Sequence, residues 1–369
     1  MTMITLRGLN RALLARQFLL ARTDRTPYEV VRHLVAVQGQ EPNWPYVGLW
    51  SRIAGFRHGD LEALLRERRV VRSTMVRRTV HLAAAEDFAW LRPTVQPLVG
   101  GLVRTSYFTE ETGDLDPAEI AAAGREALAG RTLLRRELAA LLAERFPGRL
   151  PMRLSDVVEA MEALVHTPDV GAWGGWGNRS GIGVSLAEEW SGLPMAGADL
   201  DALVLRYLAS YGPATVMDAQ MWSGMTRLRA VFDRLRPELR VLRDERGREL
   251  FDLPDAELPD ESAPAPVRFM PAFDNALLGH KDRTRIIAEE DRRRYSRLAS
   301  GGVPMFLVDG FVQGTWAVRR KVLAVAPFRP LAGDDAERVR AEAERVLEFV
   351  GAQDLVFEEA GAGKVNRMG

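Results

Sequence analysis

One order of predicted secondary structure recurs three times along the chain, and it constrains the fold more than any other feature of the sequence. In each stretch, helices with apolar residues at helical spacing are followed by a segment that alternates like two paired strands. The third stretch is the clearest: it has a helix at 199–211 that ends at Gly212-Pro213, a short helix at 215–224, a third helix that Thr226 begins, and a hairpin at 239–253 with Gly247 in its turn. Helix, short helix, turn, helix and hairpin is the order of a winged helix-turn-helix.

The first two stretches follow the same order with different signals. In the first, Thr26 and Glu29 form a capping-box pattern, with Pro27 in the first helical turn; the expected elements are helices at 10–20 and 26–37, a short helix capped by Asp60, and two strands within 70–84. In the second, a capped start at Asp116 leads to helices at 116–130, 132–145 and 155–166, and the Gly- and Trp-rich segment 170–190 is the expected hairpin. Three winged helices in tandem are therefore predicted.

The end of the chain has a different pattern. Residues 252–266 hold five acids and four prolines and are predicted to form an extended linker. Strand-like segments follow, with a tight turn expected at Asp309-Gly310, then an amphipathic helix at 335–350 and a short strand at 354–357. The predicted fold class is mainly α with β: winged helices at 1–100, 101–195 and 196–265 (the last including the linker), and a β-rich, barrel-like domain with a C-terminal helix at 266–369.

Charge is divided unevenly along the chain. The whole sequence has 50 basic and 50 acidic residues, but residues 1–100 hold fifteen arginines against eight acids, a net charge of +7. The densest basic segment is 64–81, where six arginines are accompanied by one acid, Glu67. Guanidinium groups on a helix and its wing match phosphate oxygens, so this segment is a candidate nucleic-acid contact. Basic side chains scattered over a large surface are the alternative interpretation.

Residue counts exclude several kinds of site. The chain has no cysteine, which excludes disulfides, thiolate nucleophiles and Cys-ligated metal centres. None of the five histidines stands in a metal-binding spacing; His33 and His166 are expected on amphipathic helices in structural roles. No metal and no cofactor are expected. No apolar run reaches the ~18 residues of a membrane span, and no signal peptide is recognisable, so a cytoplasmic protein without a membrane partner is expected.

One polar cluster is a candidate for chemistry. Gln38, Gly39 and Gln40 stand where the second predicted helix ends, followed by a segment rich in proline. Each glutamine amide both donates and accepts hydrogen bonds, so two converging amides can hold a water or orient a polar substrate, although they cannot remove a proton as a carboxylate does. A polar helix end followed by a loop is the alternative interpretation of the same residues.

Four segments carry a resemblance to a known family. These are VQGQEPNWPYVGLWSR at 37–52, MVRRTVHLAAAEDFAWLRP at 75–93, ASYGPATVMDAQMWSGM at 209–225 and PAFDNALLGHKDRTRI at 271–286. They resemble the AlkZ-like and YcaQ-like DNA glycosylases, winged-helix proteins that excise bulky alkylated bases and unhook interstrand crosslinks. The resemblance implies three tandem winged helices and a C-terminal β-barrel-like domain that form a C-shaped DNA-binding channel.

The resemblance also assigns a site. The family's signature in the AlkZ-like branch is Gln, a usually hydrophobic residue, then Gln, and Gln38 and Gln40 match it while Gly39 departs from the middle position. An N7-alkylguanine is cationic and already activated to leave, so the two amides are expected to orient the water that attacks C1′ of the sugar. The scarcity of lysine suits a monofunctional glycosylase, which uses water and forms no imine.

Contacts with DNA are expected from two hairpins. On the first hairpin the candidates are Arg72, Arg77, Arg78 and His81; in the C-terminal domain the Asp309-Gly310 turn is expected to probe a groove, with Arg319 and Arg320 close behind it. The segment around Lys281 is diluted by its own acids, so it is either a DNA contact or an intramolecular ion-pair network. Trp44 and Trp50 are either core residues or platforms for an exposed base.

The expected partner is double-stranded DNA with alkylated or crosslinked guanine, bound by a monomer in the nucleoid. A non-catalytic winged-helix regulator and a DNA- or RNA-binding scaffold are the alternatives, because fold alone does not determine function. Some members of the family protect antibiotic producers against their own DNA-alkylating products, such as azinomycin-type crosslinkers, and others are general repair enzymes. The Arg-, Ala- and Gly-rich composition favours self-resistance.

Overall fold

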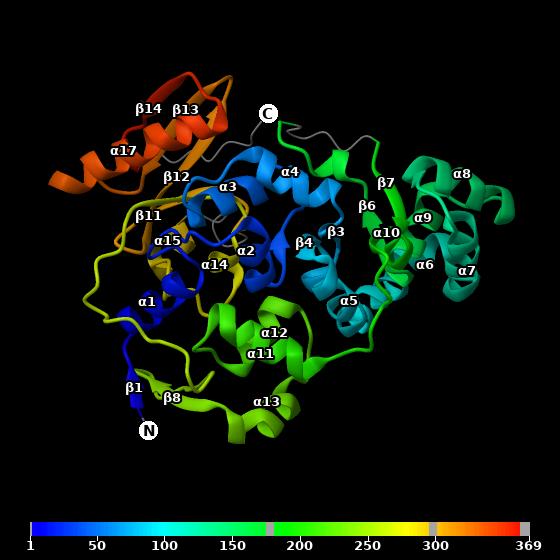
Figure 1. The fold of residues 1–369 in the computed structure, drawn as a ribbon, viewed down its shortest axis with the longest axis horizontal. Coiled ribbons are helices and arrows are strands. Elements are labelled where there is room, and N and C mark those ends of the chain that lie inside the picture. Colours follow the sequence, from blue (N-terminus) through cyan, green and yellow to red (C-terminus); the bar gives the residue numbers. More distant parts are fainter. Residues whose placement is uncertain (1, 175–180, 295–300, 362–369) are drawn as a thin grey trace.

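The first winged helix contains the predicted helices and strand pair after residue 26, together with two elements that were not predicted, a short strand and the helix that follows it. A computed structural model describes residues 2–174, 181–294 and 301–361 (Figure 1). The first copy consists of α2 (Pro27–Leu34), β2 (Val37–Gln38), α3 (Trp44–Arg52), α4 (His58–Arg66), β3 (Val70–Thr74), the 3₁₀ turn η1 (Val76–Arg78) and β4 (Val80–Ala84). Strand β4 pairs antiparallel with both β2 and β3. The unit is therefore helix, strand, helix, helix, strand, strand.

Local signals explain which predictions for this copy are correct. The capping box of Thr26 and Glu29 is confirmed, but the helix stops at Leu34 because Val35 takes a φ of 66°. Helix α3 was not predicted, because Pro45 indicates a loop. Pro45 lies in the first turn of this helix, where the missing backbone N–H is tolerated. Asp60 does not cap α4. It lies in the first turn and accepts a hydrogen bond from the backbone N–H of Arg57 at 2.8 Å.

Helix α1 (Leu6–Arg16) lies outside the first copy, although the sequence places it inside. The second copy consists of α7 (Pro117–Leu128), β5 (Leu133–Leu134), α8 (Arg135–Arg145), α9 (Pro151–Met161), β6 (Leu164–His166) and β7 (Gly183–Leu186). Helix α9 is shorter than predicted, so His166 lies on a strand rather than on a helix. Residues 175–180 of the predicted hairpin lie outside the described residues.

The first two copies share one sheet. Its order is β2-β4-β3-β6-β7-β5, and the pairing of Arg72 with His166 joins β3 of the first copy to β6 of the second. Between the copies the chain forms α5 (Ala85–Gly100), η2 (Gly101–Arg104) and α6 (Ser106–Thr112), and after the second wing it forms α10 (Ala187–Ser191). Strand β2 is thereby an edge of a six-stranded sheet.

The third copy repeats the same plan. It consists of α11 (Leu200–Tyr211), α12 (Val216–Ser223), α13 (Arg229–Leu235), η4 (Arg236–Glu238), β8 (Arg240–Asp244) and β9 (Glu249–Asp252). A bridge between Ala214 and Phe251 stands where the first strand of the other copies pairs. Thr226 does not cap the third helix, which begins at Arg229. The N-terminal β1 (Thr2–Ile4) pairs in parallel with β8 and completes a three-stranded sheet.

The C-terminal part is an open sheet rather than a barrel. Its five strands are β10 (Arg268–Met270), β11 (Met305–Val308), β12 (Phe311–Arg319), β13 (Val322–Pro327) and β14 (Asp354–Phe357), hydrogen-bonded in that order. Within the described residues, β10 and β14 are its two edges, so the predicted barrel-like closure is wrong. Helix α17 (Gly333–Val350) connects β13 to β14, which allows these two strands to be parallel.

The first winged helix and the C-terminal sheet share a hydrophobic core. Trp44 of α3 packs edge-on against Trp316 of β12, with ring centroids 5.9 Å apart, and the same core includes Phe269 and Val346. Trp44 and Trp50 are 4% and 9% exposed, so both are core residues. Figure 1 shows α2 and α3 between the C-terminal sheet and the second winged helix. The position of β2, which carries Gln38, therefore depends on both the first winged helix and the C-terminal sheet.

Candidate active site

The two glutamines lie at the edge of the shared sheet. Gln38 is the last residue of β2 and pairs with His81 of β4; its side chain is buried, while that of Gln40 is half-buried. The Gln38 Oε1 accepts the backbone N–H of Gln40 at 3.2 Å, and the Gln40 Oε1 accepts the N–H of Val80 at 3.1 Å. Each carbonyl oxygen keeps a second lone pair. Each side-chain carbonyl is therefore held by a backbone N–H, and the two glutamines stand at the end of a strand rather than at a helix end.

Gly39 is held from both sides. Its N–H donates to the Val80 carbonyl at 2.9 Å, and its carbonyl accepts from Arg72 Nε at 3.2 Å. A Cβ added at this position would stand 3.6 Å from Leu82 Cγ, an ordinary van der Waals contact. The backbone between the glutamines is therefore fixed by its partners, and the departure from the family's hydrophobic residue does not leave it loose.

His81 lies beneath the glutamines as a neutral imidazole. Its Nδ1–H donates to the Thr79 carbonyl at 2.8 Å, and its Nε2 accepts from Arg77 at 3.3 Å. Burial, followed by the charge of Arg77, lowers the pKa of His81 to about 3. Because the ring is fully buried and both nitrogens have protein partners, the structure places His81 inside the fold and not on the exposed face that the sequence predicts.

Arg72 is also directed into the protein. It is 5% exposed, and besides Gly39 it contacts Nδ1 of His166, whose Nε2–H faces Glu159 Oε1 at 3.2 Å. Burial raises the pKa of Glu159, but the hydrogen bond from His166, the charge of Arg135 and the hydrogen bond from Thr74 outweigh it and hold that pKa at about 2. Arg72 therefore links the glutamine segment to the second winged helix.

The other arginines of segment 64–81 have partners within the protein as well. Arg68 lies over the ring of Trp190, and Arg69 lies over that of Tyr28. The remaining contacts are Arg66 with Glu62, Arg77 with the Trp222 carbonyl, and Arg78 with the Leu98 carbonyl. These contacts connect the first wing to its neighbours. Four of the six arginines, Arg66, Arg68, Arg69 and Arg78, are still exposed, whereas Arg77 is half-buried and Arg72 is buried.

The two C-terminal features predicted to meet DNA lie at opposite ends of β12. The Asp309-Gly310 turn packs against α1, where Asp309 pairs with Arg7 at 2.8 Å and also contacts Arg11. Arg319 ends the strand and Arg320 follows it in the next turn; Arg320 is exposed and Arg319 half-buried. Nine residues of strand separate the turns by about 30 Å. The expectation that Arg319 stands close behind the Asp309 turn is wrong.

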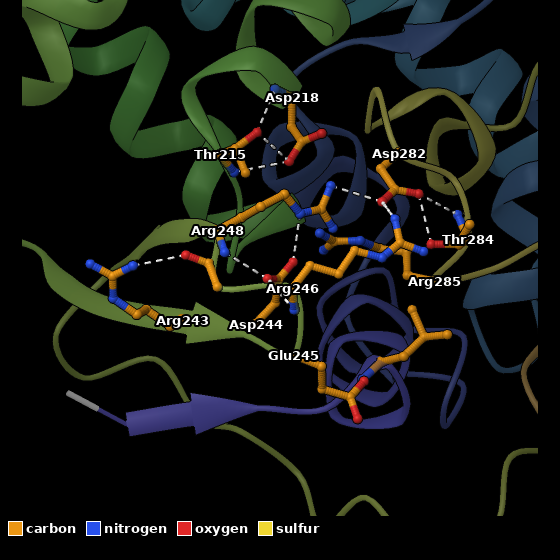
Figure 2. Close-up of polar contacts among 12 residues, drawn as sticks. Thr215, Asp218, Arg243, Asp244, Glu245, Arg246, Arg248, Asp282, Thr284 and Arg285 are labelled. Carbon is orange, nitrogen blue, oxygen red and sulfur yellow. Dashed lines mark hydrogen bonds and ion pairs between the residues drawn. The ribbon is translucent and has the colours of Figure 1, made fainter.

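The basic segment around Lys281 forms an ion-pair network. Figure 2 shows Arg248 lying between Asp244 and Asp282, at 2.6 Å and 2.8 Å, and Arg246 also reaches Asp282 at 3.0 Å. Burial raises the pKa of Asp282, but hydrogen bonds from Thr284 and the charge of Arg248 outweigh it and hold that pKa at about 2. Of the two interpretations left open by the sequence, the intramolecular network is the one observed.

Three residues at the site were not predicted, although their segments carry the family resemblance. Asn275 of α14 (Asn275–Leu278) donates to the Ala36 carbonyl at 2.8 Å and accepts the N–H of Gln38 at 3.4 Å. Asp274 makes a bidentate ion pair with Arg52, both bonds being 2.8 Å long. The available signal was the polar Asp274-Asn275 pair within the apolar run PAFDNALL.

A small cavity lies beside Gln38. It is lined by Gln38, Arg52, Asp274 and Asn275 together with apolar residues. The volume within which the centre of a water molecule can move is about 10 Å³, close to what one water requires. The Arg52 Nε–H has no hydrogen-bond partner among the described residues. The cavity has room for a water but not for a nucleobase.

Comparisons with known proteins show the family to which the chain belongs. A family model described as DNA glycosylase AlkZ-like matches residues 31–349. The chain belongs to the AlkZ-like DNA glycosylase family. An interstrand DNA cross-link repair glycosylase of Streptomyces sahachiroi is 26% identical over 370 residues, which cover 92% of this chain and 95% of that protein.

The solved structure of the DNA glycosylase AlkZ of Streptomyces sahachiroi superimposes with a TM-score of 0.81 at 24% identity, covering 97% of this chain and all of that one. That likeness confirms the mixed α and β fold. In the part of the chain that the structure describes, no helix is long and apolar enough to cross a membrane.

Proposed function

We propose that this AlkZ-like protein is a monofunctional DNA glycosylase that hydrolyses the N-glycosidic bond of bulky N7-alkylguanines and unhooks interstrand crosslinks. The observation that carries the proposal is the pair of glutamines at the end of β2, in a chain of this family. The backbone N–H of Gln40 donates to Gln38 Oε1 and that of Val80 donates to Gln40 Oε1, so both side-chain carbonyl groups have fixed positions before substrate arrives. Preorganised dipoles of this kind stabilise charge that develops in a transition state.

The chemistry follows from the leaving group. An N7-alkylguanine carries a positive charge, so cleavage of the C1′–N9 bond sends the electron pair to a cationic ring and needs little acid catalysis. Gln38 and Gln40 orient a water toward C1′, where its oxygen forms the new bond and its proton passes to solvent. His81 stays neutral beneath them because burial lowers its pKa to about 3, so it does not act as the acid. Positioning supplies most of the catalysis.

Lesion recognition takes place at an open site. The cavity beside Gln38 has room for about one water and not for a base, which supports reading of the lesion in place rather than flipping of the base into a pocket. We assign phosphate contacts to the exposed Arg78 and Arg320 and to the half-buried Arg319, while Arg72, Arg77 and His81 act from within the protein. The protein acts as a monomer on nucleoid DNA in the cytoplasm, and protects its host against a DNA-alkylating natural product.

One experiment separates this function from its alternatives. The protein is incubated with duplex DNA carrying 7-methylguanine or a nitrogen-mustard crosslink, and abasic sites are then cleaved with alkali. Strand cleavage and loss of the crosslinked species that both depend on the protein are expected. A non-catalytic regulator or a binding scaffold would shift the duplex in a gel and leave it uncleaved, and that result would contradict the proposal.

A further inference from the structure

The outer edge of β2 has an unusual partner. One side of this short strand pairs with β4, where the Gly39 N–H meets the Val80 carbonyl. On the opposite side, the Ala36 carbonyl and the Gln38 N–H both meet the side-chain amide of Asn275, at 2.8 Å and 3.4 Å. A single amide therefore occupies the place that a peptide group of a neighbouring strand would take. The edge on which Gln38 lies is closed by a side chain.

Asn275 is itself held firmly. It opens α14, whose N-cap Asp274 accepts the Ala276 N–H at 2.8 Å. The Asp274 carboxylate is fixed by the guanidinium of Arg52 on α3, and the two side chains are 3% and 2% exposed. Arg52 also donates to the Gly48 carbonyl and to Gln17. The two bonds of this buried ion pair and the further bonds of Arg52 fix one local geometry, so the position of Asn275 is set from the first winged helix.

We propose that Asn275 is a positioning residue for base excision, which holds β2 in the register that lets Gln38 and Gln40 act together. The inference rests on the proposed function of the two glutamines. Gln38 Oε1 accepts the backbone N–H of Gln40, and Gln40 Oε1 accepts that of Val80, so a displacement of β2 moves both amides. A residue 237 positions downstream thereby makes the site in the first winged helix depend on the C-terminal part of the chain.

A double-mutant cycle tests the inference. Single-turnover release of 7-methylguanine from duplex DNA is measured for wild type, Asn275→Ala, Gln38→Ala and the double variant, with duplex affinity measured beside it. We expect Asn275→Ala to slow release by about 10²-fold, the usual effect of a misplacement near 1 Å, with affinity within about threefold of wild type. In the Gln38→Ala background the Asn275 substitution should slow release no further, because coupled residues are not additive.

Asn10→Ala is the matched control. Asn10 is fully buried and donates to the carbonyls of Arg285 and Gly310 at 2.7 Å and 2.8 Å, away from the glutamines. It should lower the melting temperature as Asn275→Ala does but keep the wild-type rate. Asn275→Asp, which keeps the size and the acceptor for Gln38 but has no N–H for Ala36, is the second variant and should be at least about tenfold slower.

The outcomes distinguish a failure of the positioning role of Asn275 from a failure of the proposed function of the glutamines. A wild-type rate for Asn275→Ala or Asn275→Asp, or fold-losses that multiply with that of Gln38→Ala, would overturn the positioning role while leaving the glutamine mechanism in place. A wild-type rate for Gln38→Ala would instead refute the proposed function of the glutamines, and the inference that depends on it.

Discussion

Acidification should destabilise the protein measurably through His81 alone. The folded state keeps this imidazole neutral, with a pKa lowered to about 3 by burial and then by Arg77, whereas an unfolded histidine has a pKa near 6.5. The unfolded chain therefore binds one more proton than the folded chain between those pH values, so folding stability falls as pH falls. The contribution is complete above pH 6.5 and is lost progressively down to about pH 3.

The size of the effect follows from the same two values. Between pH 7.5 and pH 5.0 the unfolded histidine takes up nearly one proton and folded His81 takes up almost none, a loss of about 2 kcal/mol in the free energy of unfolding. The physical reason is geometric. The Nδ1–H already donates to the Thr79 carbonyl, and a proton on Nε2 would displace the Arg77 N–H and place two cations together.

Urea unfolding of wild type and His81→Gln at the two pH values isolates this contribution. The other four histidines are present in both proteins, so wild type should lose about 2 kcal/mol more than the variant on acidification. Nitrogen NMR of labelled histidine should show the Nδ1–H tautomer of His81 at pH 5.0. Equal losses in the two proteins, or a His81 ring that titrates near pH 6.5, would refute the reasoning.

Substitutions at Gly39, Asp274 and Arg320 should have different effects. Gly39→Ala should keep excision activity and stabilise the fold by about 0.4–1 kcal/mol in urea unfolding, because its Cβ meets only ordinary contacts; a loss above 1 kcal/mol would contradict this. Asp274→Ala should cost about 3–5 kcal/mol, since it leaves the buried guanidinium of Arg52 unpaired, and an unchanged melting temperature would count against it. Arg320→Ala should weaken DNA binding and lower the slope of log affinity against log salt concentration by about one. The control Arg338→Ala, on α17, should change neither the affinity nor the slope. Equal effects of the two substitutions would show that Arg320 is not a DNA contact.

Features governed by local sequence were predictable. The capping box at Thr26 and Glu29 and the N-cap at Asp116 both appear as expected, because each depends on residues within one helical turn. The three winged helices emerged from the order of such signals. Helix α3 was missed because Pro45 also fits a loop, and the packing of its apolar residues, such as Trp44 on Trp316, involves distant parts of the chain.

Long-range partners were not predictable from the sequence. The arginines of segment 64–81 have the composition of a DNA-binding face, yet two of them have acceptors on distant elements, Trp222 for Arg77 and His166 for Arg72. Asn275 meets Gln38 across 237 positions, a distance over which no periodicity or capping rule operates. The glutamines were recognised as a polar cluster from the sequence, but their role was assigned through a family signature, because two amides around a glycine also fit a polar helix end.

The central claim is that Gln38 and Gln40 hold the attacking water, and single-turnover release of 7-methylguanine tests it directly. Gln38→Ala and Gln40→Ala should each slow release by about 10²-fold or more while duplex affinity stays within about threefold, and Gln353→Ala, on an exposed residue near the C-terminal sheet, should match wild type. Wild-type rates for both Gln38→Ala and Gln40→Ala with normal DNA binding would contradict the account.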